Sequence, residues 1–130
     1  MIRAYTSEQN NVQVGPHFKV KEFACKDGSA ITFIDDYMVT ILELLRKELG
    51  DKPIIITSGY RTPAHNAKVG GAKYSYHMRG MAVDIRVKGN SAKEVAKALD
   101  KIVDGCGIIV YESWVHFDVR EGKKYRKGVT

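Results

Sequence analysis

The sequence has no long hydrophobic run. Its longest unbroken apolar stretch has four residues, from Ile108 to Tyr111. A helix that crosses a membrane needs about 20 apolar residues, so we expect no membrane-spanning helix. Residues 1–14 also lack the apolar stretch of roughly 7–15 residues that a secretory signal contains. We therefore expect a chain that stays in the cytosol, leaves it by another route, or has lost a leader.

Cysteine is scarce as well, because Cys25 and Cys106 are the only two in 130 residues. Two cysteines cannot form the disulfide framework of a small secreted protein, and these two lack the close spacing of a cysteine-rich zinc site. Two small buried side chains are the simpler interpretation. A single bridge between them is the alternative.

Acidic residues are fewer than basic ones, 15 against 21, which gives a net charge of +6. Five of the cations and one of the anions lie in residues 120–127, so this segment carries most of the excess. We interpret residues 121–130 as a solvated basic tail, with attraction to a polyanion as the functional alternative. No helix-turn-helix, zinc-finger spacing or aromatic RNA-binding motif is present, so no nucleic-acid partner is expected.

The patterns that are present predict one domain that mixes helices and strands. Residues 1–16 are expected to be a loose N-terminal segment. Apolar residues recur at helical spacing over 35–49 and 91–103, and Thr62-Pro63 is a typical start of a short third helix. The expected strands are residues 53–57, which we interpret as buried, and 81–88, 105–111 and 114–120. This order predicts an α+β fold, with a small, mainly antiparallel sheet and helices on one face.

Two of these expected strands alternate, and each has one polar face. Asp84 lies on the polar face of 81–88, His116 lies on that of 114–120, and His77 precedes the first of them. If the strands are close in the sheet, the Asp84 and His116 side chains point to the same side. Two imidazoles and one carboxylate, with a fourth position open, are the ligand set of a catalytic zinc site. Unconnected polar residues, each satisfied by its neighbours, are the alternative on spacing alone.

Three motifs resemble a known family. Residues 75–84, Ser-Tyr-His-Met-Arg-Gly-Met-Ala-Val-Asp, fit the pattern S-x-H-x-x-G-x-A-x-D. Residues 58–63 read Ser-Gly-Tyr-Arg-Thr-Pro, and residues 114–118 read Trp-Val-His-Phe-Asp. In this order they resemble the zinc D-alanyl-D-alanine carboxypeptidases, the M15 group of peptidoglycan peptidases. The resemblance covers residues 17–120. It implies a zinc peptidase domain with a hedgehog/DD-peptidase-like fold, in which His77, Asp84 and His116 bind Zn²⁺.

The resemblance also implies hydrolysis of amide bonds in peptidoglycan stem peptides, by D-Ala-D-Ala carboxypeptidase or murein endopeptidase action. Arg61 occupies the family's arginine position and is expected to hold a substrate carboxylate or the developing oxyanion. Many relatives have an acid three residues before the last zinc histidine, where this chain has Ser113. Glu112 and Asp118 both lie on the His116 side of the expected strand, so either could be the general base. Asp118 could instead orient a histidine or an arginine.

Ser75, Tyr111 and Trp114 are further candidates for substrate binding. Ser75 could instead brace the ligand loop, and Trp114 could cover the edge of the sheet. We expect a monomer that acts at the bacterial cell wall, made in the cytoplasm and released as a phage endolysin is, or else an excised domain. The alternative is a non-catalytic, zinc-folded module that binds the cell wall, which the serine at position 113 favours.

Overall fold

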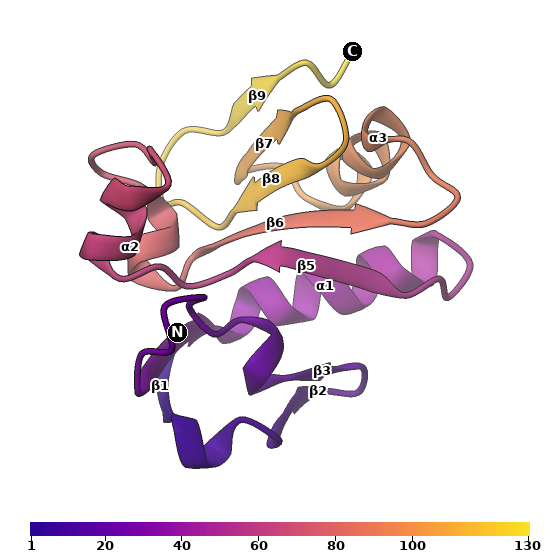
Figure 1. The fold of residues 1–130 in the computed structure, drawn as a ribbon. Coiled ribbons are helices and arrows are strands. Elements are labelled where there is room, and N and C mark those ends of the chain that lie inside the picture. The colour runs from indigo at the N-terminus through magenta and orange to yellow at the C-terminus, as the bar shows by residue number, and fades with distance from the viewer.

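The computed structural model describes all 130 residues, and its fold is α+β, as predicted (Figure 1). The helices are α1 (Asp36–Glu48), α2 (Pro63–Lys68) and α3 (Ala92–Ile102), and the 3-10 turns are η1 (Ser7–Gln9), η2 (Val20–Glu22) and η3 (Tyr76–Arg79). The strands are β1 (Ile2–Thr6), β2 (Gln13–Gly15), β3 (Phe18–Lys19), β4 (Ile31–Asp35), β5 (Ile54–Ser58), β6 (Ala82–Val87), β7 (Gly107–Val110), β8 (Val115–Asp118) and β9 (Tyr125–Lys127). None of the helices has the length and apolar character needed to cross a membrane.

The main sheet has five strands in the order β5-β6-β8-β7-β9. All its pairs are antiparallel except β7 with β9. The helix α3 packs against β6, β7 and β8, and α1 packs against α3 (Figure 1). The short helix α2 lies instead beside the end of the sheet where β6 begins (Figure 1). This arrangement confirms a mainly antiparallel sheet whose long helices cover one face.

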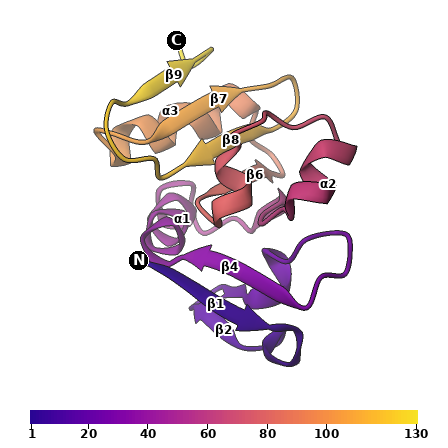
Figure 2. The same ribbon diagram turned by 90° about the vertical axis from the view of Figure 1, so that its left-hand side faces the viewer.

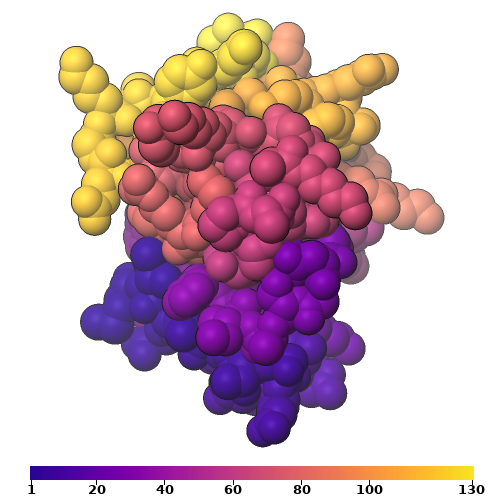
Figure 3. All heavy atoms as spheres, turned by 60° about the vertical axis from the view of Figure 1, so that its left-hand side comes forward, coloured from indigo at the N-terminus to yellow at the C-terminus, as the bar shows by residue number.

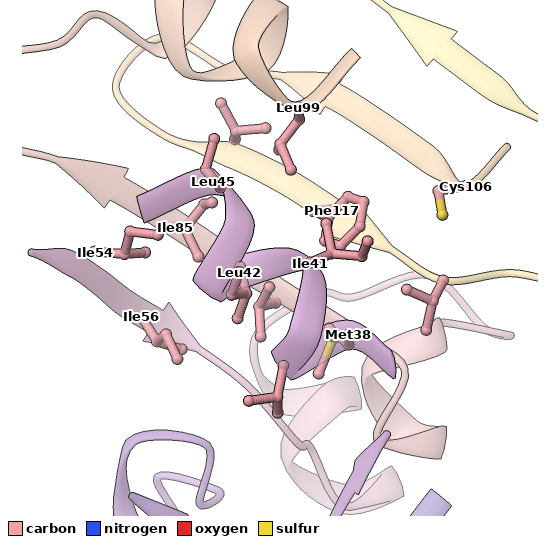
Figure 4. Packing of buried hydrophobic residues seen from close by; sticks show 14 of the residues in the cluster. Met38, Ile41, Leu42, Leu45, Ile54, Ile56, Ile85, Leu99, Cys106 and Phe117 are labelled. Carbon is pink, nitrogen blue, oxygen red and sulfur yellow. The ribbon is translucent and has the colours of Figure 1, made fainter. Parts of the chain in front are cut away.

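The core lies between α1, α3 and the sheet. The helix α1 begins after Asp35, whose carboxylate accepts hydrogen bonds from the first backbone N–H groups of the helix. Its apolar side chains then pack onto those of the main sheet and of α3 (Figure 4). The labelled members of this cluster are Met38, Ile41, Leu42, Leu45, Ile54, Ile56, Ile85, Leu99, Cys106 and Phe117. Both cysteines of the chain are buried free thiols.

The middle strands of the sheet place polar residues on the face that the helices leave uncovered. Val83 and Ile85 of β6 are fully buried in the core, and Asp84 between them points to the opposite face because strand side chains alternate. His116 of β8 likewise lies between the buried Val115 and Phe117. Asp84 and His116 are directly paired across the two strands. The register therefore brings these two candidate ligands together.

The termini are more ordered than expected. Strand β1 pairs with β4, a strand that the sequence patterns did not reveal (Figure 2). The expectation of a loose segment over residues 1–16 is therefore wrong. Strand β9 pairs with β7, and Val129 is buried, so residues 121–130 are not simply a solvated tail. The limits of the peptidase domain at residues 17 and 120 stay predictions.

The expectation that residues 53–57 form a buried strand is wrong in one respect. Strand β5 lies at an edge of the main sheet, and Ile55 and Thr57 are exposed on it. Ile54 and Ile56 alone point into the core. An apolar run of this length reads the same for an edge strand and a central strand, because the pattern does not show which neighbours the strand will have.

Candidate metal centre

The structure brings His77, Asp84 and His116 together, with one potential ligand atom of each within 4.8 Å of the others. The Nε2 atom of His77 lies 3.3 Å from Oδ1 of Asp84, and Nδ1 of His116 lies 3.4 Å from the same oxygen. Ligand atoms about 2.0–2.2 Å from a tetrahedral zinc ion are about 3.4 Å apart. The cluster therefore has the size of a zinc site.

The position of His77 depends on a short turn. Ser75 caps η3, and its Oγ accepts a hydrogen bond from the His77 backbone N–H at 3.1 Å. Gly80 ends the turn with a φ of +74°, and a Cβ atom there would collide with the backbone of Phe33. Only glycine can adopt this positive φ and also fit against the Phe33 backbone at low energetic cost. Ser75 and Gly80 thus hold the buried His77 ring next to β6.

Each candidate ligand ring has its other nitrogen fixed by an acceptor. Nδ1 of His77 lies 2.7 Å from the carbonyl oxygen of Gly59, which can only accept, so this nitrogen carries the proton and Nε2 has a free lone pair. Nε2 of His116 lies 2.7 Å from Oδ2 of Asp118, and Nδ1 is then the free nitrogen. Outer acceptors of this kind set the tautomer and orientation of metal-binding histidines. The residues present therefore fit a zinc ion chemically as well as in size.

The carboxylate of the cluster, Asp84, and the neighbouring carboxylate of Asp118 are held in the ionised form. Burial opposes ionisation of Asp84, but the adjacent His116 and His77 side chains outweigh it and keep the pKa of Asp84 well below its usual range. Burial also opposes ionisation of Asp118, yet Arg120 and His116 lower its pKa to about 2. Negative charge at Asp84 is what a cation site requires.

Arg61 lies beside the cluster and contacts Asp84. Its Nη2 donates to Oδ2 of Asp84 at 3.2 Å, its Nε to Ser58 at 3.0 Å, and its Nη1 to the buried Asn66 at 3.3 Å. A guanidinium has five N–H groups, so two remain for another partner. Arg61 thus holds the second oxygen of Asp84 and lines the pocket beside it.

The two candidates for the general base lie in very different surroundings. Asp118 is fully buried, and its two oxygens accept four hydrogen bonds, three from Arg120 and one from His116. Such a carboxylate has no lone pair left for a water molecule. Glu112 is exposed in the turn between β7 and β8, and it does not line the pocket. Asp84 is the only carboxylate that does.

Arg120 is a site residue to which the sequence patterns assigned no role. Its guanidinium holds both oxygens of Asp118 at 2.7 Å and lies over the rings of Tyr76 and Tyr125, 4.9 and 5.0 Å from their centroids. The alternation of residues 114–120 could have indicated this role, because it places position 120 on the same side as His116. No sequence pattern pointed to Asn66 or to the Gly59 carbonyl. Their contacts to Arg61 and His77 form only when the loops of the folded chain come together.

A pocket of about 440 Å³ opens beside the cluster. The four expected substrate-binding residues, Arg61, Ser75, Tyr111 and Trp114, all line it, together with Arg120. The Tyr111 and Trp114 rings are stacked with centroids 4.6 Å apart. Residues around 60–80, magenta to rose in Figure 3, lie on this side of the molecule between the N-terminal and C-terminal residues.

Known proteins resemble parts of this chain. A stretch covering 44% of it is 42% identical to the zinc D-Ala-D-Ala carboxypeptidase of Streptomyces albus G, over 23% of that protein. A longer stretch covering 68% of it is 34% identical to the peptidoglycan L,D-endopeptidase MepK of Escherichia coli K12, over 52% of that protein. The chain thus spans about half the length of these relatives or less. Residues 16–118 match the family described as Peptidase M15, and because this match covers most of the chain, the protein belongs to the M15 peptidase family.

Proposed function

We propose that the protein is a zinc-dependent peptidase that hydrolyses amide bonds of peptidoglycan stem peptides at the bacterial cell wall. The observation that carries this proposal is the cluster of His77, Asp84 and His116 beside a pocket of substrate size. Family membership supports peptidase chemistry. The names of the two relatives, which act on peptidoglycan or on D-Ala-D-Ala, support the substrate.

His77, Asp84 and His116 would hold the ion. Two nitrogen ligands and one carboxylate oxygen suit Zn²⁺ better than Ca²⁺ or Mg²⁺, which prefer oxygen ligands. A zinc ion with an open position lowers the pKa of a bound water toward 7 and polarises a substrate carbonyl. Asp118 and the Gly59 carbonyl keep the two rings in the required tautomers.

Arg61 is the group best placed to bind charge on the substrate. Two of its N–H groups have no partner in the protein, and its side chain is fixed by three hydrogen bonds. A guanidinium fixed in this way can hold a substrate carboxylate or a developing oxyanion without reorganising. Ser75, Tyr111 and Trp114 would form walls of the same pocket.

We assign the general base to Glu112 and a positioning role to Asp118. The four hydrogen bonds to Asp118 leave it no access to water. Glu112 is exposed and only two residues from Trp114, which lines the pocket. A change in the turn at Glu112 and Ser113 on substrate binding would bring this carboxylate to the attacking water, whose proton it would pass to the leaving amine.

A second candidate function has its own observation. The only carboxylate that lines the pocket is Asp84, which is a candidate metal ligand, so none remains there to act as a general base. Position 113, where many relatives have an acid, is a serine. A module that binds the cell wall through the same zinc-supported pocket, without cleaving it, would have these features.

One assay separates the two functions. Purified protein loaded with zinc is incubated with purified peptidoglycan, and the release of amino groups is measured with and without a chelator, and after zinc is restored. Peptidase action predicts release that the chelator stops and zinc restores, and none from His116→Ala. Binding to peptidoglycan without release, at full zinc content, would favour the non-catalytic module.

A further inference from the structure

A second hollow lies next to the candidate metal centre and shares Asp84 with the first. This second hollow, a pocket of about 390 Å³, is lined by Thr57, Ser58, Asp84, Arg86, Ser113 and Trp114. Asp84 and Trp114 line both pockets. The candidate metal centre therefore lies between two hollows rather than at the blind end of one. A bound peptide could extend from the centre in both directions.

Strand register places Arg86 at a defined distance along this second hollow. Asp84 pairs with His116, and Arg86 follows on the same open face of β6, two residues farther along. Two residues of a strand span about 7 Å. An extended peptide advances at most about 3.3–3.6 Å per residue, so for a peptide that runs along β6 from the candidate metal centre, Arg86 lies level with a group about two residues from the bond that is cut.

Arg86 differs from the other arginines that line the two hollows. Arg61 and Arg120 are ion-paired with Asp84 and Asp118. The side chain of Arg86 is exposed and has no ion pair or side-chain hydrogen bond. The only carboxylate in its pocket is Asp84, which is already held by two histidines and Arg61. The second hollow thus contains one uncompensated cation beside the hydroxyl groups of Ser113 and Thr57.

We propose that Arg86 forms a second substrate subsite, which binds a carboxylate of the peptide about two residues from the scissile bond. This inference rests on the proposed function for the identity of the substrate. The carboxylate has two possible sources in a stem peptide, the C-terminus or an acidic side chain. A C-terminal carboxylate would make the enzyme cut near the chain end, and a side-chain carboxylate would allow cleavage within the stem.

The test measures binding to metal-free protein, in which no cleavage interferes. The probes are three synthetic stem tetrapeptides: one with all carboxylates free, one with a C-terminal amide, and one with its side-chain carboxylates amidated. Affinities are measured by calorimetry for the parent protein, Arg86→Gln and Arg86→Lys. Lys88→Gln is the matched control, because Lys88 is an exposed cation two residues farther along the same strand direction and outside the pocket.

Arg86→Gln is expected to weaken binding of the free peptide about five- to tenfold, as loss of a partly exposed, charge-assisted contact should. Arg86→Lys should recover part of the loss. The effect of Arg86→Gln should vanish with one of the two amidated peptides, which identifies the source of the carboxylate. Lys88→Gln should bind like the parent.

Three results would overturn the proposal: equal binding by Arg86→Gln and the parent, an equal loss in Lys88→Gln, or no measurable binding of the free peptide to the parent. The proposed function is judged separately, by amino-group release from peptidoglycan by the zinc-loaded parent. Release by the parent together with unchanged peptide affinity in Arg86→Gln would reject the subsite alone.

Discussion

At the scale of single residues, each candidate ligand imidazole is oriented by a hydrogen-bond acceptor at the ring nitrogen that does not face Asp84. Alternation in residues 81–88 and 114–120 predicted that Asp84 and His116 share a face, and the pairing of β6 with β8 agrees. The face of a strand on which a residue lies follows from local alternation, so the sequence alone could predict it. The Gly59 carbonyl behind His77 and the Arg61 contact to Asp84 depend on how a loop folds back, so no local pattern could predict them.

Substitution of Asp118 should affect zinc affinity, whereas substitution of Glu112 should affect turnover. Asp118→Asn should weaken zinc binding about 10–100-fold, because the amide no longer holds the His116 ring as a charged acceptor does. Glu112→Gln should leave zinc affinity unchanged and lower turnover about 10²–10⁴-fold if it is the base. Zinc affinity by competition with a chromogenic chelator, and turnover at matched zinc content, separate the two. Parent-like turnover in Glu112→Gln would remove it as the base.

Arg61 should matter for turnover more than for folding. Arg61→Ala removes a group that can stabilise charge in the transition state, a loss of about 2–4 kcal/mol. The measurement is kcat/KM on peptidoglycan fragments, with zinc content and thermal unfolding recorded for the same samples. Arg79→Ala is a suitable control, because Arg79 ends η3 and does not line the pocket. Equal kcat/KM for Arg61→Ala and the parent would contradict the assignment.

At the scale of elements, the long helices and the central strands could be predicted, and the short strands at the termini could not. The patterns of α1, α3, β6 and β8 repeat over enough residues to be recognised. Strand β9, by contrast, has three residues, Tyr-Arg-Lys, and pairs with β7 in parallel. Its sequence reads as a charged tail, because pairing with a distant strand leaves no local pattern.

The attachment of β9 gives a prediction about stability. Arg126 donates to the carbonyl oxygens of Val103, Gly105 and Cys106 and pairs with Asp100. Arg126→Ala leaves these partly buried acceptors without a partner and should cost about 1–3 kcal/mol of unfolding free energy. Urea unfolding measures the change, with Lys127→Ala as the control, because Lys127 is exposed and has no such contacts. A loss as large in Lys127→Ala would contradict this account of β9.

At the scale of the whole molecule, one cluster of buried side chains joins α1, α3 and the main sheet and includes Phe18, Val20 and Phe23 of the N-terminal part. The sequence predicted the fold class from the order of the elements. It did not predict that the N-terminal residues would share this core, since β1, β2 and β3 are short and β1 pairs with the distant strand β4.

Two adjacent leucines of α1 test the role of this core. Leu45 is fully buried, and Leu44 is 47% exposed. Leu45→Ala should therefore lower the free energy of unfolding by about 2–5 kcal/mol, through lost burial and the cavity left behind. Leu44→Ala should change it by about 0.5 kcal/mol or less. Chemical unfolding followed by circular dichroism gives both values, and equal losses would show that α1 does not pack as described.

The central claim is that His77, Asp84 and His116 hold one zinc ion, and zinc content after reconstitution tests it most directly. The protein is stripped of metal, incubated with zinc, freed of excess ion and assayed for zinc per chain. We predict one zinc per chain in the parent and in His65→Ala, whose histidine lies in α2 outside the cluster, and little or none in His77→Ala and His116→Ala. Full zinc occupancy in both His77→Ala and His116→Ala would contradict the account.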